Sequence, residues 1–369
     1  MGDQINVWID DLQAFFLRIL DLPMAFQLLI WILSFSTIWI LFLYLLGVMK
    51  FKSFSTSGKI TVYCSSIFIT VSAVGASIFD YKQKQMESWI LNNKKTVIIT
   101  KVIESNSTES YFKNLIPKLK LLSFGKVSKV DYVENNPGLE ILEISLGEPV
   151  INAFLATIDL KKYEVILDPD ILQKELTSSY AKRFNVDFAV NGEAGTSPGK
   201  NAPLGQWTGN YVVNGKAILL QDSRQRPFFS FDKNSIAKYY SDTVLITRPN
   251  PEMHNVIWGR FDLMTNGKIA ISPKDGTRNN LYPRTIVGVD KTGSRMFFLV
   301  ADGRKPLYSK GMSMQMCGEI MKIVGAQDAM ACDQGGSSMM YSKNLGVVNK
   351  PADGGERVVY THLGFKIKK

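Results

Sequence analysis

Residues 329–341 combine the side chains most able to carry chemistry in this chain. An apolar run predicts a buried strand that ends at a single carboxylate, Asp333. The next residues are a glutamine, two glycines and two serines: Gln334, Gly335, Gly336, Ser337 and Ser338. The glycines allow backbone N–H groups to approach a ligand closely, and the serines add hydroxyl donors. A carboxylate beside such a turn suits a substrate that carries a leaving group and a phosphate. The alternative is a hairpin turn capped by Asp333.

Other short polar motifs lie next to apolar runs. They are Asn191-Gly192-Glu193, Arg284-Thr285, Asp302-Gly303-Arg304 and Asp353-Gly354-Gly355-Glu356-Arg357. Each alone is typical of a capped turn. Together they supply carboxylates and arginines on loops that a sheet would hold, which is a common way to build a site.

The order of these motifs resembles that of the phosphodiester glycosidases. The segments that carry the resemblance are 180–192, 283–304, 311–338 and 353–358, with a looser match at 150–160 that resembles the opening strand of the family. The resemblance covers about residues 140–369. It implies the hydrolysis of a phosphate-linked glycan or sugar substrate, without a cofactor.

Three positions depart from the family pattern. Gln334 occupies the first glycine position of Asp-Gly-Gly-Gly-Ser-Ser, and its Cβ restricts the backbone and could narrow the pocket. Glu193-Ala194 replaces a glycine and an aromatic residue, and Ala331 replaces a frequent asparagine. These changes indicate altered specificity or lost activity on a retained fold.

The resemblance also implies roles for named residues. Cleavage at an anomeric carbon commonly needs two carboxyl groups, and we expect Asp333 and Asp302 to form that pair. Glu193 is a further candidate acid by its position, although the family pattern does not require it. The expected substrate- and phosphate-binding residues are Asn191, Gly192, Arg284, Thr285, Arg304, Gly335, Gly336, Ser337, Ser338 and Arg357. The alternative is structural: Asp302 and Asp333 cap turns, and the arginines pair with Asp353 and Glu356.

The N-terminal third predicts attachment to a lipid bilayer. Residues 1–22 form an amphipathic stripe that suits a helix at the membrane interface, and the uncharged runs 24–48 and 60–79 are long enough to span the bilayer. The loop between the spans carries Lys50, Lys52 and Lys59, so the positive-inside rule predicts an extracytoplasmic C-terminal domain, which we expect at a bacterial cell membrane.

Two other classes of function remain open at this stage. One is a non-catalytic membrane protein that binds an exported, phosphate-bearing glycopolymer during exopolysaccharide assembly. The other is a partner-binding anchor formed by the spans, although they contain no charged residue of the kind that marks transport.

The rest of the chain predicts an α+β domain. Short apolar runs separated by Gly, Pro and Asn predict mainly antiparallel strands over 140–369, with helices near 170–184 and 313–324. Further predicted elements include a strand at 243–247 and a helix at 111–122. Residues 81–139 are interpreted as a stalk or cap.

The composition of the chain limits which ligands and partners we expect. The 369 residues carry a net charge of +10, but the lysines are scattered, which argues against nucleic acid. Three cysteines and two histidines make a zinc site improbable, although a hard divalent cation would need no sequence signature. Cys317 and Cys332 are expected as buried thiols, with a disulfide as the alternative.

Overall fold

The computed structural model describes residues 110–171, 174–193, 209–220, 226–242 and 252–368. The expected interfacial helix, both expected spans, residues 81–109 and the strand at 243–247 lie outside these ranges. No helix within them is both long and apolar enough to cross a membrane.

The main element of the fold is an eight-stranded sheet in which neighbouring strands are antiparallel. In order across the sheet, the strands are β1 (Val127–Asn136), β2 (Leu139–Leu146), β3 (Ile151–Asp159), β14 (Arg295–Ala301), β13 (Arg284–Val289), β15 (Asp328–Ala331), β11 (Phe261–Thr265) and β12 (Lys268–Ile269). The sheet therefore extends N-terminal to residue 140 through β1.

Two five-stranded antiparallel sheets complete the β structure. One contains, in order, β7 (Lys216–Leu219), β6 (Tyr211–Val213), β10 (Asn255–Trp258), β8 (Phe228–Phe231) and β9 (Ala237–Tyr240). The other contains β17 (Gly346–Val347), β16 (Met340–Ser342), β5 (Phe188–Asn191), β18 (His362–Ile367) and β4 (Tyr163–Ile166). Mainly antiparallel strands with few helices confirm the predicted fold class for the described part of the chain.

The helices in the described ranges are short: α4 (Ile116–Leu119), α5 (Thr177–Phe184), α6 (Met314–Ile323) and the 3₁₀ turn η2 (Gly335–Ser337). Ser313 begins α6 as its N-cap, where its hydroxyl accepts a hydrogen bond from the N–H of Met316 at 3.2 Å. The prediction of a helix over 111–122 is wrong in length. Pro117 lies in the first turn of α4, as is typical of a helix start, and the N–H groups of Tyr111 and Phe112 donate to the carboxylate of Glu140.

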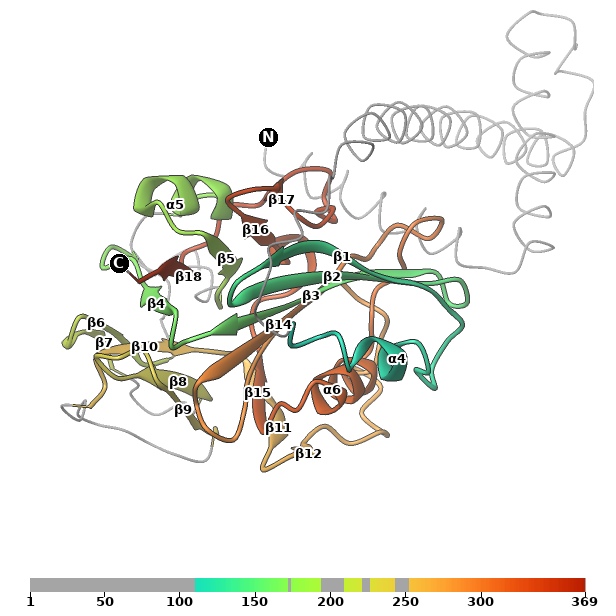
Figure 1. The fold of residues 1–369 in the computed structure, drawn as a ribbon, viewed down its shortest axis with the longest axis horizontal. Coiled ribbons are helices and arrows are strands. Elements are labelled where there is room, and N and C mark those ends of the chain that lie inside the picture. Colours follow the sequence, from blue (N-terminus) through green and yellow to red (C-terminus); the bar gives the residue numbers. More distant parts are fainter. Residues whose placement is uncertain (1–109, 172–173, 194–208, 221–225, 243–251, 369) are drawn as a thin grey trace, which may run out of the picture. The chain divides into compact units, whose positions relative to one another are not determined.

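The eight-stranded sheet is covered on both faces, as strand β14 illustrates. Met296, Phe298 and Val300 belong to the core shared with the five-stranded sheets, whereas Phe297, Leu299 and Ala301 belong to the core shared with α4 and α6. Figure 1 shows α4 and α6 together on one side of this sheet. Because successive side chains point to opposite faces, burial of both faces explains the continuous apolar run in the sequence.

The two described cysteines are free thiols. Cys317 lies on α6 and Cys332 follows β15, and both are buried. This finding confirms the thiol interpretation over the disulfide.

Candidate active site

The polar motifs predicted from the sequence converge where strands of different sheets end. Asn191 ends β5, Thr285 lies on β13, and Asp333 follows β15. The fully buried Asn191 amide donates to the backbone carbonyls of Gly192 (3.0 Å) and Asp333 (2.9 Å). Its oxygen accepts from the Thr285 hydroxyl (2.8 Å) and the Met339 N–H (2.9 Å). Asn191 and Thr285 therefore fix the backbone on both sides of the glycine turn.

Where these strands end, the carboxyl groups of Glu193 and Asp333 both bind the guanidinium of Arg260. Arg260 Nη2 lies 2.8 Å from Glu193 Oε1 and 3.0 Å from Asp333 Oδ1. Arg260 Nε also donates to Glu193 Oε1 at 2.8 Å. The structure thus pairs Asp333 with Glu193 through Arg260.

Glu193 is almost completely buried, with 3% of its surface exposed. Burial raises the pKa of its carboxyl to about 7, and Asp333 also raises this pKa while Arg260 lowers it. Oε2 of Glu193 has no hydrogen-bond partner among the residues that the structure describes. A buried acid with one unoccupied oxygen and a pKa near neutrality is suited to proton transfer.

Backbone packing dictates where Glu193 and Arg260 lie. A Cβ at Gly192 would stand 2.4 Å from Thr361 Oγ1, and that hydroxyl donates to the carbonyl of Glu193 at 2.7 Å. A Cβ at Gly259 would stand 2.8 Å from the carbonyl oxygen of Ala331. Glycine at both positions therefore allows the chain to approach its neighbours closely.

Arg260 is the functional candidate that sequence reasoning missed. It lies between β10 and β11, and its N–H donates to the carbonyl of Ala331 at 2.7 Å. The signal in the sequence was an apolar run, Val256 to Trp258, followed by a glycine and a charged side chain. The other site motifs have the same pattern.

The glycine turn after Asp333 explains why Gln334 is tolerated there. Gln334 has φ −128° and ψ −179°, an extended conformation that any residue adopts. Gly335 has φ +72°, and a Cβ at Gly336 would stand 1.8 Å from Asp353 Oδ2. The second position of the motif therefore requires glycine, the third packs against the ends of the Asp353 and Arg357 side chains, and the first does not require glycine.

Arg284 lies behind this turn and is 4% exposed. Its guanidinium donates to the side-chain oxygen of Gln334 and to the backbone carbonyls of Met312 (2.9 Å), Arg278 (2.9 Å) and Asn280 (2.7 Å). Burial lowers the pKa of Arg284. These contacts occupy four of its five N–H donors within the protein and position Gln334.

The serines that follow the glycines are buried as well. Ser337 and Ser338 are each 2% exposed, and the Ser338 N–H donates to the carbonyl of Gly335 at 3.1 Å. Among the described residues, the Ser338 hydroxyl has no hydrogen-bond partner.

Asp302 has a separate environment, and none of its described hydrogen bonds goes to Asp333. Its carboxylate accepts from the Asn349 amide (3.0 Å), the Lys350 N–H (2.9 Å) and the Tyr308 hydroxyl (3.0 Å). Burial raises the pKa of Asp302 to about 6. Asn349 also donates to the carbonyl of Ser338 at 3.1 Å, which links Asp302 to the glycine turn.

Arg304 and Arg357 come together over the same turn. Arg304 Nη1 donates to Asp353 Oδ1 at 3.2 Å, and Arg357 Nη2 donates to Asp353 Oδ2. Arg304 also donates to the hydroxyl of Tyr282 and stacks on its ring, with the guanidinium carbon 4.6 Å from the ring centroid. These two arginines are 35% and 47% exposed, respectively, so they are accessible to solvent.

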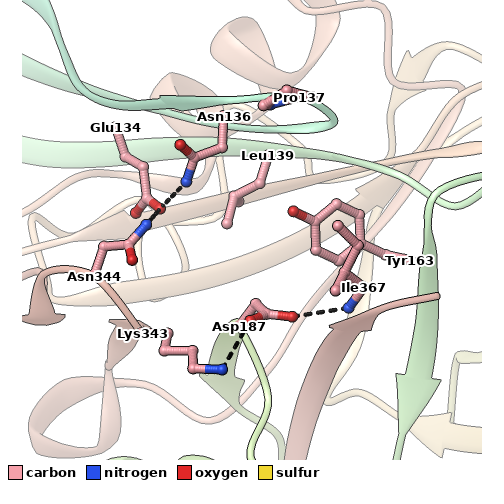
Figure 2. A pocket seen from close by; sticks show the side chains of 9 residues that line it. All are labelled: Glu134, Asn136, Pro137, Leu139, Tyr163, Asp187, Lys343, Asn344 and Ile367. Atoms are coloured by element: carbon pink, nitrogen blue, oxygen red, sulfur yellow. Dashed lines mark hydrogen bonds and ion pairs between the residues drawn. The ribbon is translucent and has the colours of Figure 1, made fainter. Parts of the chain in front are cut away.

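A pocket of about 290 Å³ with both charged and apolar lining residues lies elsewhere, beyond the opposite end of β5. Figure 2 shows Glu134 linked to Asn136 and Asn344, and Asp187 linked to Lys343 and the backbone of Ile367. None of the predicted site residues lines this cavity. In the described ranges, no cluster of three or more His, Cys, Asp or Glu residues could hold a metal ion.

Residues 184–366 match the family model described as phosphodiester glycosidase, which confirms the predicted resemblance. The catalytic domain of zebrafish N-acetylglucosamine-1-phosphodiester alpha-N-acetylglucosaminidase, in a form auto-inhibited by its pro-peptide, is similar in structure. It has a TM-score of 0.51 and 20% identity, over 65% of this chain and 88% of that one. A hypothetical protein from Synechocystis has a TM-score of 0.50 and 10% identity, over 65% of this chain and 64% of that one. At such identities the likeness concerns the fold. None of the curated proteins matches the sequence.

Proposed function

The C-terminal domain of this chain resembles the phosphodiester glycosidases, and we propose that it hydrolyses a sugar-1-phosphate diester between the anomeric carbon and the phosphate oxygen. The observation that carries this proposal is the carboxyl pair of Glu193 and Asp333 on Arg260. Hydrolysis at an anomeric carbon passes through an oxocarbenium-like transition state that such a pair serves.

The distance between the two carboxyl groups supports a mechanism with a covalent intermediate. Glu193 Oε1 and Asp333 Oδ1 contact the same nitrogen, so these two oxygens lie at most about 6 Å apart, which is below the ~6.5–9.5 Å separation of inverting glycosidases. In this mechanism Asp333 attacks the anomeric carbon while the C1–O bond breaks toward the phosphate. Water then cleaves the glycosyl-enzyme ester.

The protonation of Glu193 supports its role as acid and base. The pKa near 7 leaves a proton available for the departing phosphate oxygen, and the resulting carboxylate can take a proton from the attacking water. A phosphate leaves as a weak base, so charge stabilisation contributes more than proton donation. Arg304 and Arg357 supply that charge from the neighbouring loops.

The proposal includes membrane attachment. The uncharged runs 24–48 and 60–79 support an anchor that holds the domain outside the cytoplasm, where a cell-surface glycan or glycoconjugate would be the substrate.

The test uses the full chain in detergent and a panel of sugar-1-phosphate methyl diesters, with and without EDTA. We expect release of free sugar, and loss of release with kept ligand affinity in Asp333→Asn. Asp159→Asn is the matched control, because Asp159 also faces an arginine, Arg295 at 3.7 Å, away from the site. Binding without sugar release from the wild-type chain would contradict the proposal and favour a non-catalytic glycopolymer binder.

A further inference from the structure

The carboxylate of Asp353 lies between two arginines. One oxygen contacts Arg304 at 3.2 Å, and the other contacts Arg357. Each guanidinium is thus directed at one oxygen of the same planar anion. A phosphate group presents oxygens in a similar way and binds guanidinium groups at least as well as a carboxylate does.

This cluster rests directly on the glycine turn of the carboxyl pair. A Cβ at Gly336 would stand 1.8 Å from Asp353 Oδ2 and 2.4 Å from Arg357 Nη2. The anion and one arginine therefore pack on the bare Cα of Gly336, three residues along the chain from Asp333. An anion bound here would adjoin the proposed reaction centre.

The surroundings carry more positive than negative charge. Among the described residues, four basic side chains interact with one or both of the carboxylates Asp302 and Asp353: Arg304, Lys305, Lys350 and Arg357. The pKa of Lys305 is lowered to about 8, chiefly by burial and also by the neighbouring Lys350, against the opposing effects of Asp302 and Asp353. The excess of positive charge favours a group with more negative charge than one carboxylate, such as a phosphate.

The segment that carries Asp353 has room to move. The chain between Asn349 and Val359 forms no helix or strand. A Cβ at Gly354 or Gly355 would meet no described atom within 4 Å, and Gly354 has φ +86°. Two unobstructed glycines next to Asp353 allow its carboxylate to leave the arginines without disturbing the sheets.

We propose that Arg304 and Arg357 form a phosphate site, and that Asp353 is a built-in anion which the phosphate of a ligand displaces. The identity of that ligand as a sugar-1-phosphate diester, or its phosphate product, rests on the proposed function. The displacement itself does not. An exposed ion pair is typically worth at most ~1 kcal/mol, so a phosphate held by both arginines can replace it.

The experiment measures the dissociation constant of inorganic phosphate by calorimetry on the full chain in detergent. We expect Asp353→Asn to bind phosphate about fivefold more tightly than the wild type, the factor that corresponds to ~1 kcal/mol. Asp353→Ser should behave in the same way. Asp159→Asn, with the same loss of one charge beside an arginine, should leave the constant unchanged.

A second set of variants assigns the gain to the arginines. Adding Arg304→Gln or Arg357→Gln to Asp353→Asn should abolish the tighter binding. Equal or weaker phosphate binding by both Asp353 variants, with unchanged melting temperatures, would overturn the proposal. A gain that survives loss of either arginine would do the same.

Sugar release from a diester, measured on the same samples, separates this proposal from the proposed function. Tighter phosphate binding by the Asp353 variants without any sugar release would support the displacement of Asp353 and contradict the proposed glycosidase activity. Sugar release together with a phosphate dissociation constant that the Asp353 variants leave unchanged would support the glycosidase activity and contradict the displacement of Asp353. A parallel titration with a sugar 1-phosphate distinguishes a site for phosphate alone from one that also accepts the sugar.

Discussion

The side-chain nitrogen of Asn191 donates a hydrogen bond to the backbone carbonyl of Asp333 over 2.9 Å. Asn191 ends β5 in a five-stranded sheet, and Asp333 follows β15 in the eight-stranded sheet. Both Asn191 side-chain atoms bond to groups of the protein itself. Asn191 therefore holds the proposed nucleophile in place across two sheets, a role that its position at a strand end did not reveal.

The activity should fall as pH rises above about 7. Glu193 must carry a proton to act as the acid, and burial raises its pKa to about 7, so the proton is present below that pH and lost above it. Glu193→Gln should lower kcat about 10²–10⁴-fold and remove this descending limb from the residual rate. The measurement is kcat/KM between pH 5 and 9. An unchanged limb in Glu193→Gln would assign the titration to another group.

The sugar should leave with the anomeric configuration that it had in the diester. Both carboxyl groups contact Arg260, which brings them close enough for direct attack by Asp333. Proton NMR during the first minutes of reaction distinguishes the anomers before mutarotation. An inverted first product would contradict the covalent mechanism and indicate a water between substrate and carboxylate.

Asp302→Asn should destabilise the protein. The Asp302 carboxylate accepts from Asn349, Lys350 and Tyr308, and an amide nitrogen in its place would face one of these donors. We expect a loss of about 1–3 kcal/mol in the free energy of unfolding. Denaturant unfolding measures it, with Asp159→Asn as the control. Unchanged stability together with lost turnover would instead favour the catalytic role first predicted for Asp302.

Two substitutions in the glycine turn should differ in cost. Gly335 has φ +72°, so Gly335→Ala should cost about 1–2 kcal/mol from backbone strain alone. Gln334 is extended, so Gln334→Gly should cost about 0.5–1 kcal/mol through added chain entropy, and any larger loss measures the hydrogen bond that Gln334 accepts from Arg284. Thermal melting of both variants tests the order. A larger loss in Gln334→Gly would mean that Arg284 depends on Gln334 for its burial.

The sequence by itself determined that the domain consists mainly of short strands, and it located the polar motifs at the strand ends. Apolar runs that stop at a glycine and a polar side chain identified Asp333, Glu193 and Asn191, because this pattern is local and strands are short. Order and spacing of the motifs indicated the family, which the match over residues 184–366 confirms. The membrane spans and the roles of the site residues stay predictions.

Only the tertiary structure decided which polar groups meet. The sequence pairs Asp333 with Asp302, the acid of a neighbouring motif, whereas the structure brings Asp333 to Glu193 through Arg260. These three residues come from segments far apart in the chain, and the register of antiparallel strands decides which strand ends lie side by side. Local patterns do not say which strands pair, since strands that are buried on both faces read as continuous apolar runs and lack the alternation that would set their register.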